Sequence, residues 1–123
     1  MNNPKPPQPT AVQPAPQDSW TNYVEDFRRA GHQTVDWIAQ YLSSISDRQV
    51  LAQTQPGQLL DALPASAPAQ GESFDAIMRD FDRLVMPAVT QWNHPRFFAY
   101  FACTGSTPAI LGEMLAAALN TNG

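Results

Sequence analysis

The chain has 123 residues, which leaves room for one small domain at most. Seven basic and eleven acidic residues give a net charge of −4, and the basic residues form no cluster, so nucleic-acid binding through phosphate neutralisation is not expected. A single cysteine excludes an internal disulfide and a cysteine-based zinc site, and without a secretory leader or a membrane-length apolar run the chain is predicted to be soluble and cytoplasmic.

The first 17 residues, MNNPKPPQPTAVQPAPQ, hold six of the twelve prolines and no aromatic residue. Such a segment buries too little apolar area to offset the chain entropy lost on folding. Residues 1–17 are therefore predicted to form a disordered tail rich in proline and glutamine, and residues 18–123 the ordered part. A proline-rich ligand for an SH3-like partner is the less favoured alternative.

A long amphipathic helix is predicted over about residues 20–45, after the good N-cap residues Asp18 and Ser19. Its apolar side chains mostly follow i, i+3, i+4 spacing. His32 is expected to be a solvated residue of this helix. The rest of the chain offers little apolar surface to cover the helix, so the apolar face is expected to meet another subunit or another part of the same polypeptide. The apolar positions are Trp20, Tyr23, Val24, Phe27, Val35, Ile38, Tyr41, Leu42 and Ile45.

Two shorter helices are predicted after a connector, and they make the fold class mainly α. Residues 47–71 contain three prolines, one of them followed by glycine, so they cannot form one continuous helix. A helix with an apolar stripe runs from about residue 72 to the Met-Pro pair at 86–87. A third follows Ser106, with Pro108 well placed in its first turn, and stops near the Asn-Thr-Asn-Gly sequence at 120–123.

The stretch HPRFFAYFACTGSTPAIL, which begins at His94, combines three phenylalanines, a tyrosine and the only cysteine. It is too irregular for a plain helix or strand, so it is either core or the wall of a pocket. Composition alone favours the core for Phe97, Phe98 and Phe101, and a small buried residue at Cys103. His94, which precedes a proline in a turn, is expected to form structural hydrogen bonds rather than to act as a base.

The segment WNHPRFFAYFACTGSTPAILGEML, residues 92–115, resembles the N-terminal region of pyridoxal-phosphate-dependent amino-acid decarboxylases of the aromatic (DOPA, tryptophan, tyrosine) type. Three further stretches occur in the order of that family: FRRAGHQTVDWIAQYL, PGQLLDALPASAP and FDAIMRDFDRLVMPAVTQWNHPRFFAYF. The resemblance covers about residues 20–123. It implies the helical N-terminal segment of a fold-type I enzyme whose intact fold is α/β, a homodimer, and pyridoxal 5'-phosphate as the cofactor.

The resemblance also implies roles for four residues in substrate binding. In that family the turn matching Tyr100 and Phe101 lines the substrate pocket, and Cys103 stands where relatives often carry a threonine that contacts the substrate. The loop at the position of Asn122 reaches across the dimer into the neighbouring active site. Glutamate decarboxylases share the HPRFF sequence but then carry polar amide residues, whereas Ala99, Tyr100 and Phe101 follow here, which favours an aromatic substrate.

The cofactor of this family is attached to a lysine, and the only lysine here, Lys5, lies in the proline-rich tail. The chain is therefore expected to be the N-terminal part of a carboxy-lyase that converts an aromatic L-amino acid to its amine, truncated before the cofactor domain and inactive alone. No catalytic, cofactor-binding or metal-binding residue is predicted within it. The alternative is a non-catalytic helical dimerisation or interaction module, which the missing lysine favours and the match of the pocket-forming turn opposes.

Overall fold

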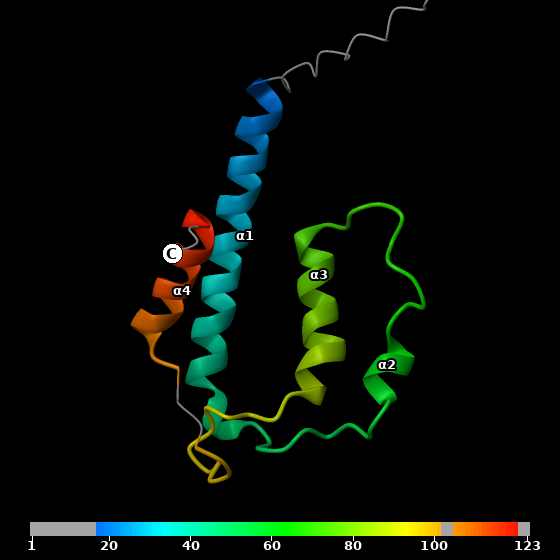
Figure 1. Ribbon diagram of the computed structural model, residues 1–123, viewed down its shortest axis with the longest axis vertical. Coiled ribbons are helices and arrows are strands. Elements are labelled where there is room, and N and C mark those ends of the chain that lie inside the picture. Colours follow the sequence, from blue (N-terminus) through cyan, green and yellow to red (C-terminus); the bar gives the residue numbers. More distant parts are fainter. Residues whose placement is uncertain (1–16, 102–104, 121–123) are drawn as a thin grey trace, which may run out of the picture. The chain divides into compact units, whose positions relative to one another are not determined.

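The computed structural model describes residues 17–101 and 105–120, and every regular element within these ranges is helical (Figure 1). The mainly α fold class is thus confirmed. Residues 1–16 of the predicted tail, Cys103 and Asn122 lie outside the described residues. The chain divides into two compact units, Met1–Trp37 and Ile38–Gly123, with the boundary inside the first helix. The helices are α1 (Gln17–Ser43), α2 (Gln58–Ala62), α3 (Phe74–Asp80) and α4 (Thr107–Leu119).

The described part of the first unit is the larger portion of α1, which begins and ends slightly earlier than its sequence predicts. Its ion pairs, such as Arg28 with Glu25 at 3.4 Å, are exposed and stabilise the helix little. His32 is exposed, as expected. Five apolar side chains of this unit are exposed as well, and they define the α1 apolar face: Trp20, Tyr23, Val24, Phe27 and Val35. The unit therefore does not bury this face with its own residues.

The last turn of α1 is closed by serine side chains. The hydroxyls of Ser43 and Ser44 both donate to the carbonyl oxygen of Gln40, each at 2.9 Å. Serine hydroxyls that bond the preceding turn compete with continued α-helical bonding. The chain accordingly passes into a single 3₁₀ turn, Ile45–Asp47.

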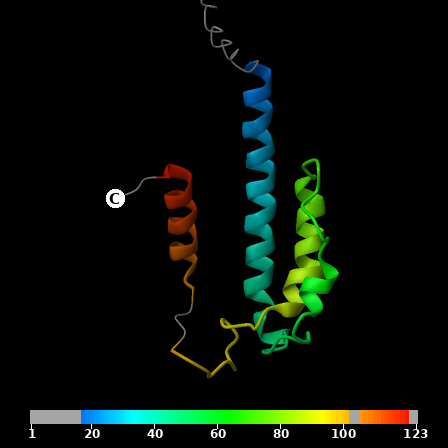
Figure 2. The same ribbon diagram turned by 45° about the vertical axis from the view of Figure 1, so that its right-hand side comes forward.

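In the second unit, α3 changes pitch before the end that the sequence predicts. Its α-helical part stops at Asp80 and is followed by a wider π turn, Phe81–Val85, and a 3₁₀ turn, Met86–Ala88. Pro87 has no N–H to continue the α-helical pattern, which explains the change. The short helix α2, which the sequence did not reveal, contacts the π turn, and Figures 1 and 2 both place it beside this part of the chain.

Two extended segments join the ends of the loop that carries α2 and α3. The Gln91 amide donates to the Val50 carbonyl at 2.8 Å, and the Gln53 amide donates to the Pro87 carbonyl at 3.1 Å. Residue numbers rise along one segment as they fall along the other, so the two segments run antiparallel. This pairing places the turn that follows Gln91 next to the C-terminal end of α1.

Burial among the described residues is confined to two polar side chains. Gln91 is 4% exposed and His94 is 3% exposed, whereas no apolar side chain in the described ranges is fully buried. These residues therefore form no apolar core of their own, as the uncovered helix face led us to expect. No helix in the described part of the chain is both long and apolar enough to cross a membrane.

The start of α3 gives a first testable prediction. The Ser73 hydroxyl accepts a hydrogen bond from the Ala76 amide at 3.3 Å and so caps the helix. We expect Ser73→Ala to lower the free energy of unfolding by about 1 kcal/mol. Thermal unfolding measures the loss. Ser66→Ala, in the exposed connector, is the matched control, and an equal effect of both substitutions would contradict a capping role.

Candidate functional site

Three aromatic rings stack on one another in the aromatic turn, which we define as residues 92–101. The ring centroids of Trp92 and Phe97 are 5.7 Å apart, and those of Trp92 and Tyr100 are also 5.7 Å apart. Phe97 and Tyr100 complete the set at 6.4 Å. Stacking at such separations stabilises each pair by about 0.5–1.5 kcal/mol beyond its buried area. The turn therefore holds Trp92 and Phe97 close to the Tyr100 ring.

The rings of Phe98, Tyr100 and Phe101 are exposed, so the core assignment that composition favours for two of them needs correction. Tyr100 is 81% exposed and Phe98 is 89% exposed, while Phe101 is fully exposed and only Phe97 is half-buried. The core assignment is wrong for Phe98 and Phe101 because the described residues contain no apolar core to receive them. The aromatic turn is thus a surface of the described chain.

Tyr100 has a backbone conformation that is unfavourable for a non-glycine residue. Its φ angle is +61°, in the left-handed region. Residues in such conformations cost of order 1–3 kcal/mol and persist where their surroundings hold them, often at functional sites. Here the stack on Trp92 and Phe97 supplies part of that support.

Gln91 and His94 anchor the aromatic turn through hydrogen bonds. The Tyr41 hydroxyl donates to Gln91 Oε1 at 2.7 Å, and the Gln91 side-chain amide donates to the Val89 carbonyl at 3.2 Å. The Arg96 amide donates to His94 Nδ1 at 2.9 Å, so Nδ1 must accept and Nε2 carries the proton. His94 Nε2 then donates to the Ser46 carbonyl at 3.3 Å. His94 is therefore a structural hydrogen-bonder, as the sequence predicted.

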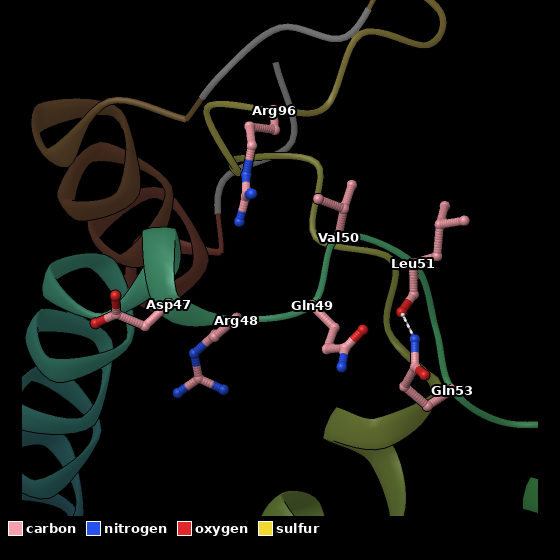
Figure 3. Close-up of a pocket in the computed structure, with 7 residues that line it drawn as sticks. All are labelled: Asp47, Arg48, Gln49, Val50, Leu51, Gln53 and Arg96. Carbon is pink, nitrogen blue, oxygen red and sulfur yellow. Dashed lines mark hydrogen bonds between the residues drawn. The ribbon is translucent and has the colours of Figure 1, made fainter.

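A polar cavity of about 520 Å³ lies beside this anchor (Figure 3). In the view of Figure 3 the Arg48 and Arg96 side chains extend on opposite sides of the 47–50 backbone, so their charges do not converge on one point. The Arg48 guanidinium lies 5.1 Å from the centre of the Tyr41 ring. Arg96 is the one residue of the aromatic turn that lines the cavity, and neither Tyr100 nor Phe101 does. Its lining residues are Asp47, Arg48, Gln49, Val50, Leu51, Gln53 and Arg96.

Of the four residues with implied substrate contacts, the structure describes two. Tyr100 and Phe101 are adjacent and exposed in the aromatic turn, while Cys103 and Asn122 lie outside the described residues. The sequence placed Tyr41 on the apolar side of the first helix and did not single out Gln91. Their bond joins residues 50 positions apart, so no local pattern could have revealed it.

The described residues do not fit covalent attachment of pyridoxal phosphate, because they contain no lysine. The side chains of histidine, aspartate and glutamate in these ranges also form no group of three that could hold a metal ion. What the described part of the chain offers is an aromatic surface and a hydrogen-bonded support beneath it.

Comparison with curated proteins gives relatives that act on amino acids or make aromatic products. The chain is 45% identical over 100 residues to aromatic-L-amino-acid decarboxylase of Sus scrofa, covering 81% of this chain and 21% of the relative. It is 44% identical over 104 residues to histidine decarboxylase of Mus musculus, covering 85% and 16%. It is 48% identical over 99 residues to phenylacetaldehyde synthase of Petunia hybrida, covering 80% and 20%. The chain thus spans about a fifth of the length of these relatives.

Solved structures of related decarboxylases superpose on this chain. The tryptophan decarboxylase of Catharanthus roseus in complex with L-tryptophan superposes with a TM-score of 0.74 at 41% identity, over 79% of this chain and 20% of that one. Oryza sativa TDC with PLP and tryptamine superposes with a TM-score of 0.71 at 37% identity, over 92% and 22%. The helical architecture is therefore that of a segment of these enzymes.

The family profile of the pyridoxal-dependent decarboxylase conserved domain matches residues 56–123. This range is more than half of the chain and includes the aromatic turn. Pyridoxal phosphate is the cofactor of this family, and it is present in the rice structure. The chain therefore belongs to the family of pyridoxal-dependent decarboxylases.

Proposed function

We propose that this chain is the N-terminal part of a pyridoxal-phosphate-dependent decarboxylase that converts an aromatic L-amino acid to its amine and carbon dioxide. Family membership, the names of the relatives and the tryptophan-bound neighbour support this reading. On this proposal a lysine outside the described residues would hold the cofactor, which would supply an electron sink for the decarboxylation. A cytoplasmic location and the division into a tail of residues 1–17 and a helical segment of residues 18–123 remain predictions from the sequence.

The aromatic turn is proposed to form one wall of the substrate pocket, and it is the main observation behind the proposal. Tyr100 presents an exposed ring that lies close to Trp92 and Phe97, and Phe101 adds a second exposed ring. An aromatic substrate side chain can stack on such rings, while a carboxylate side chain gains nothing from them. Cys103, two residues further on, is proposed to contact the same side chain. The turn would orient the substrate and exclude water from its side chain.

The α1 apolar face is proposed to be a dimer contact. Trp20 is 68% exposed and Phe27 is 63% exposed, and both are large aromatic residues of the kind that anchor interfaces. Five exposed apolar side chains on one helix form a surface that soluble proteins usually cover. A second copy of the chain is the partner we propose, with Asn122 contributing to the pocket of the neighbouring subunit.

The product formed by the protein from its complete reading frame tests the proposal. We expect carbon dioxide and the matching amine from L-tryptophan, L-tyrosine, L-phenylalanine or L-histidine in the presence of pyridoxal phosphate. L-Glutamate is the matched control, and the aromatic turn predicts at least about a 100-fold lower kcat/KM for it, in the range that loss of specific pocket contacts produces.

Three outcomes would contradict the proposal in different ways. Preferred turnover of L-glutamate would remove the aromatic substrate class. Formation of an aromatic aldehyde in place of the amine would indicate the reaction that the name of the Petunia relative describes. Failure to bind pyridoxal phosphate, together with self-association, would favour the non-catalytic interaction module.

A further inference from the structure

The two buried side chains of the described residues, Gln91 and His94, connect the aromatic turn to the end of α1. The Tyr41 hydroxyl bonds Gln91 at 2.7 Å across 50 positions of sequence, and His94 bonds the Ser46 carbonyl at 3.3 Å across 48 positions. Both bonds are therefore tertiary contacts rather than parts of the turn itself. Tyr41, Gln91 and His94 are called the polar cluster below.

The polar cluster is connected to both rings that support Tyr100. Trp92 directly follows Gln91 in the chain, and the Phe97 amide donates to the His94 carbonyl at 2.9 Å. The His94 ring also accepts from the Arg96 amide at 2.9 Å, which fixes the backbone just before Phe97. A shift of Gln91 or His94 would thus move Trp92 and Phe97, and Tyr100 rests on these two rings.

Hydrogen bonds constrain orientation more narrowly than apolar contacts do, because their strength falls steeply with angle. Where a buried polar group has all its partners, it favours one arrangement of the surrounding chain. Gln91 and His94 are the only buried side chains in the described ranges, and hydrogen bonds hold both. The strained φ of Tyr100 requires such support.

We propose that Tyr41, Gln91 and His94 are positioning residues for the substrate pocket. They hold the aromatic turn so that the Tyr100 ring meets the side chain of the substrate, and they do not touch the substrate themselves. This inference rests on the proposed function, because it assumes that Tyr100 belongs to the pocket wall.

The test uses the protein from its complete reading frame, loaded with pyridoxal phosphate, and the variants Tyr41→Phe, Gln91→Met and their combination. Tyr41→Phe removes one hydroxyl and keeps the ring beneath Arg48. We expect amide hydrogen exchange in residues 92–101 to become up to about tenfold faster, which is the net contribution of one hydrogen bond. The KM for the aromatic substrate should rise by a similar factor, with kcat changed less than about twofold. A poorly held turn weakens binding of the substrate and of the transition state equally, and such a loss raises KM without lowering kcat.

The double variant separates positioning from simple destabilisation. Gln91→Met alone removes the acceptor of the bond from the Tyr41 hydroxyl, whereas Tyr41→Phe/Gln91→Met removes both groups of this part-buried bond. Removing both members of a hydrogen-bonded pair is less harmful than removing one. The combined effect on KM and on exchange should therefore be smaller than the product of the two single effects. Ser66→Ala is the control, because it removes a hydroxyl from an exposed side chain outside the polar cluster and the α1 apolar face.

Hydrogen exchange tests the positioning role, and turnover tests the proposed function, so each can be contradicted without the other. Unchanged exchange in residues 92–101 of Tyr41→Phe, or a change no larger than in Ser66→Ala, would overturn the positioning role even in a fully active enzyme. Effects that multiply in the double variant would overturn it as well. Faster local exchange in a protein that turns over no aromatic amino acid would agree with the structural role of the polar cluster. It would contradict the proposed function on which the inference rests.

Discussion

Replacing Tyr100 with alanine is expected to lower kcat/KM for the preferred aromatic amino acid by about 10- to 200-fold, the effect of losing one well-defined pocket contact. The variant removes the exposed ring that the aromatic turn presents, together with its hydroxyl. It leaves Trp92 and Phe97 stacked on each other. Alanine also keeps the left-handed φ unfavourable, so the backbone strain is not relieved.

Steady-state kinetics and thermal unfolding on the same preparations decide between a pocket residue and a packing residue. Tyr100→Phe is the matched variant, because it keeps the ring and should lose far less activity than Tyr100→Ala. A pocket residue lowers kcat/KM with a small change in the melting temperature. A large loss of melting temperature with unaltered kcat/KM would instead mean that Tyr100 packs against another part of the enzyme and has no contact with the substrate.

Placing a charge on the α1 apolar face is expected to weaken the dimer by at least about 30-fold, which corresponds to a hot-spot contribution of about 2 kcal/mol. Phe27→Glu puts a carboxylate in the middle of this face, between Tyr23 and Val35 along the helix. A charge buried in an interface without a partner is costly to desolvate. Sedimentation velocity over a range of protein concentrations measures the change in self-association.

The control for this substitution is His32→Glu, which adds the same charge to an exposed polar position of α1. It should leave the assembly unchanged. If Phe27→Glu and His32→Glu assemble equally well, the α1 apolar face is not the dimer contact. Loss of activity in Phe27→Glu together with loss of the dimer would in addition support a pocket that is completed across the two subunits.

The helices that sequence patterns predicted correctly are those whose ends depend on local chemistry. Ser106 caps α4 through a bond from the Ala109 amide at 3.4 Å, with proline in the first turn, as its position in the sequence indicated. At the other end, Asn120 takes the left-handed conformation, with φ +47°, that closes a helix. Such signals act over a few residues, so one sequence is enough to read them.

Features that depend on distant residues could not be predicted. The helix α2 begins at Gln58, directly after its N-cap residue Gly57, whose φ is +88°, and the helix contacts the π turn of residues 81–85. Gln91 looked like an ordinary polar residue, and its burial follows from Tyr41 and Val50, which are far away in the sequence. The exposure of Phe98 was missed for a related reason, since composition does not tell whether a core is present to receive an aromatic ring.

The long sequence separation of the Tyr41–Gln91 bond has a kinetic consequence. Helices α1, α3 and α4 contain only contacts between near neighbours and can form within microseconds. The bond between Tyr41 and Gln91 closes a loop of 50 residues, so its entropic cost falls on a later step, after the helices exist. The aromatic turn is therefore among the last parts of this chain to acquire its native shape.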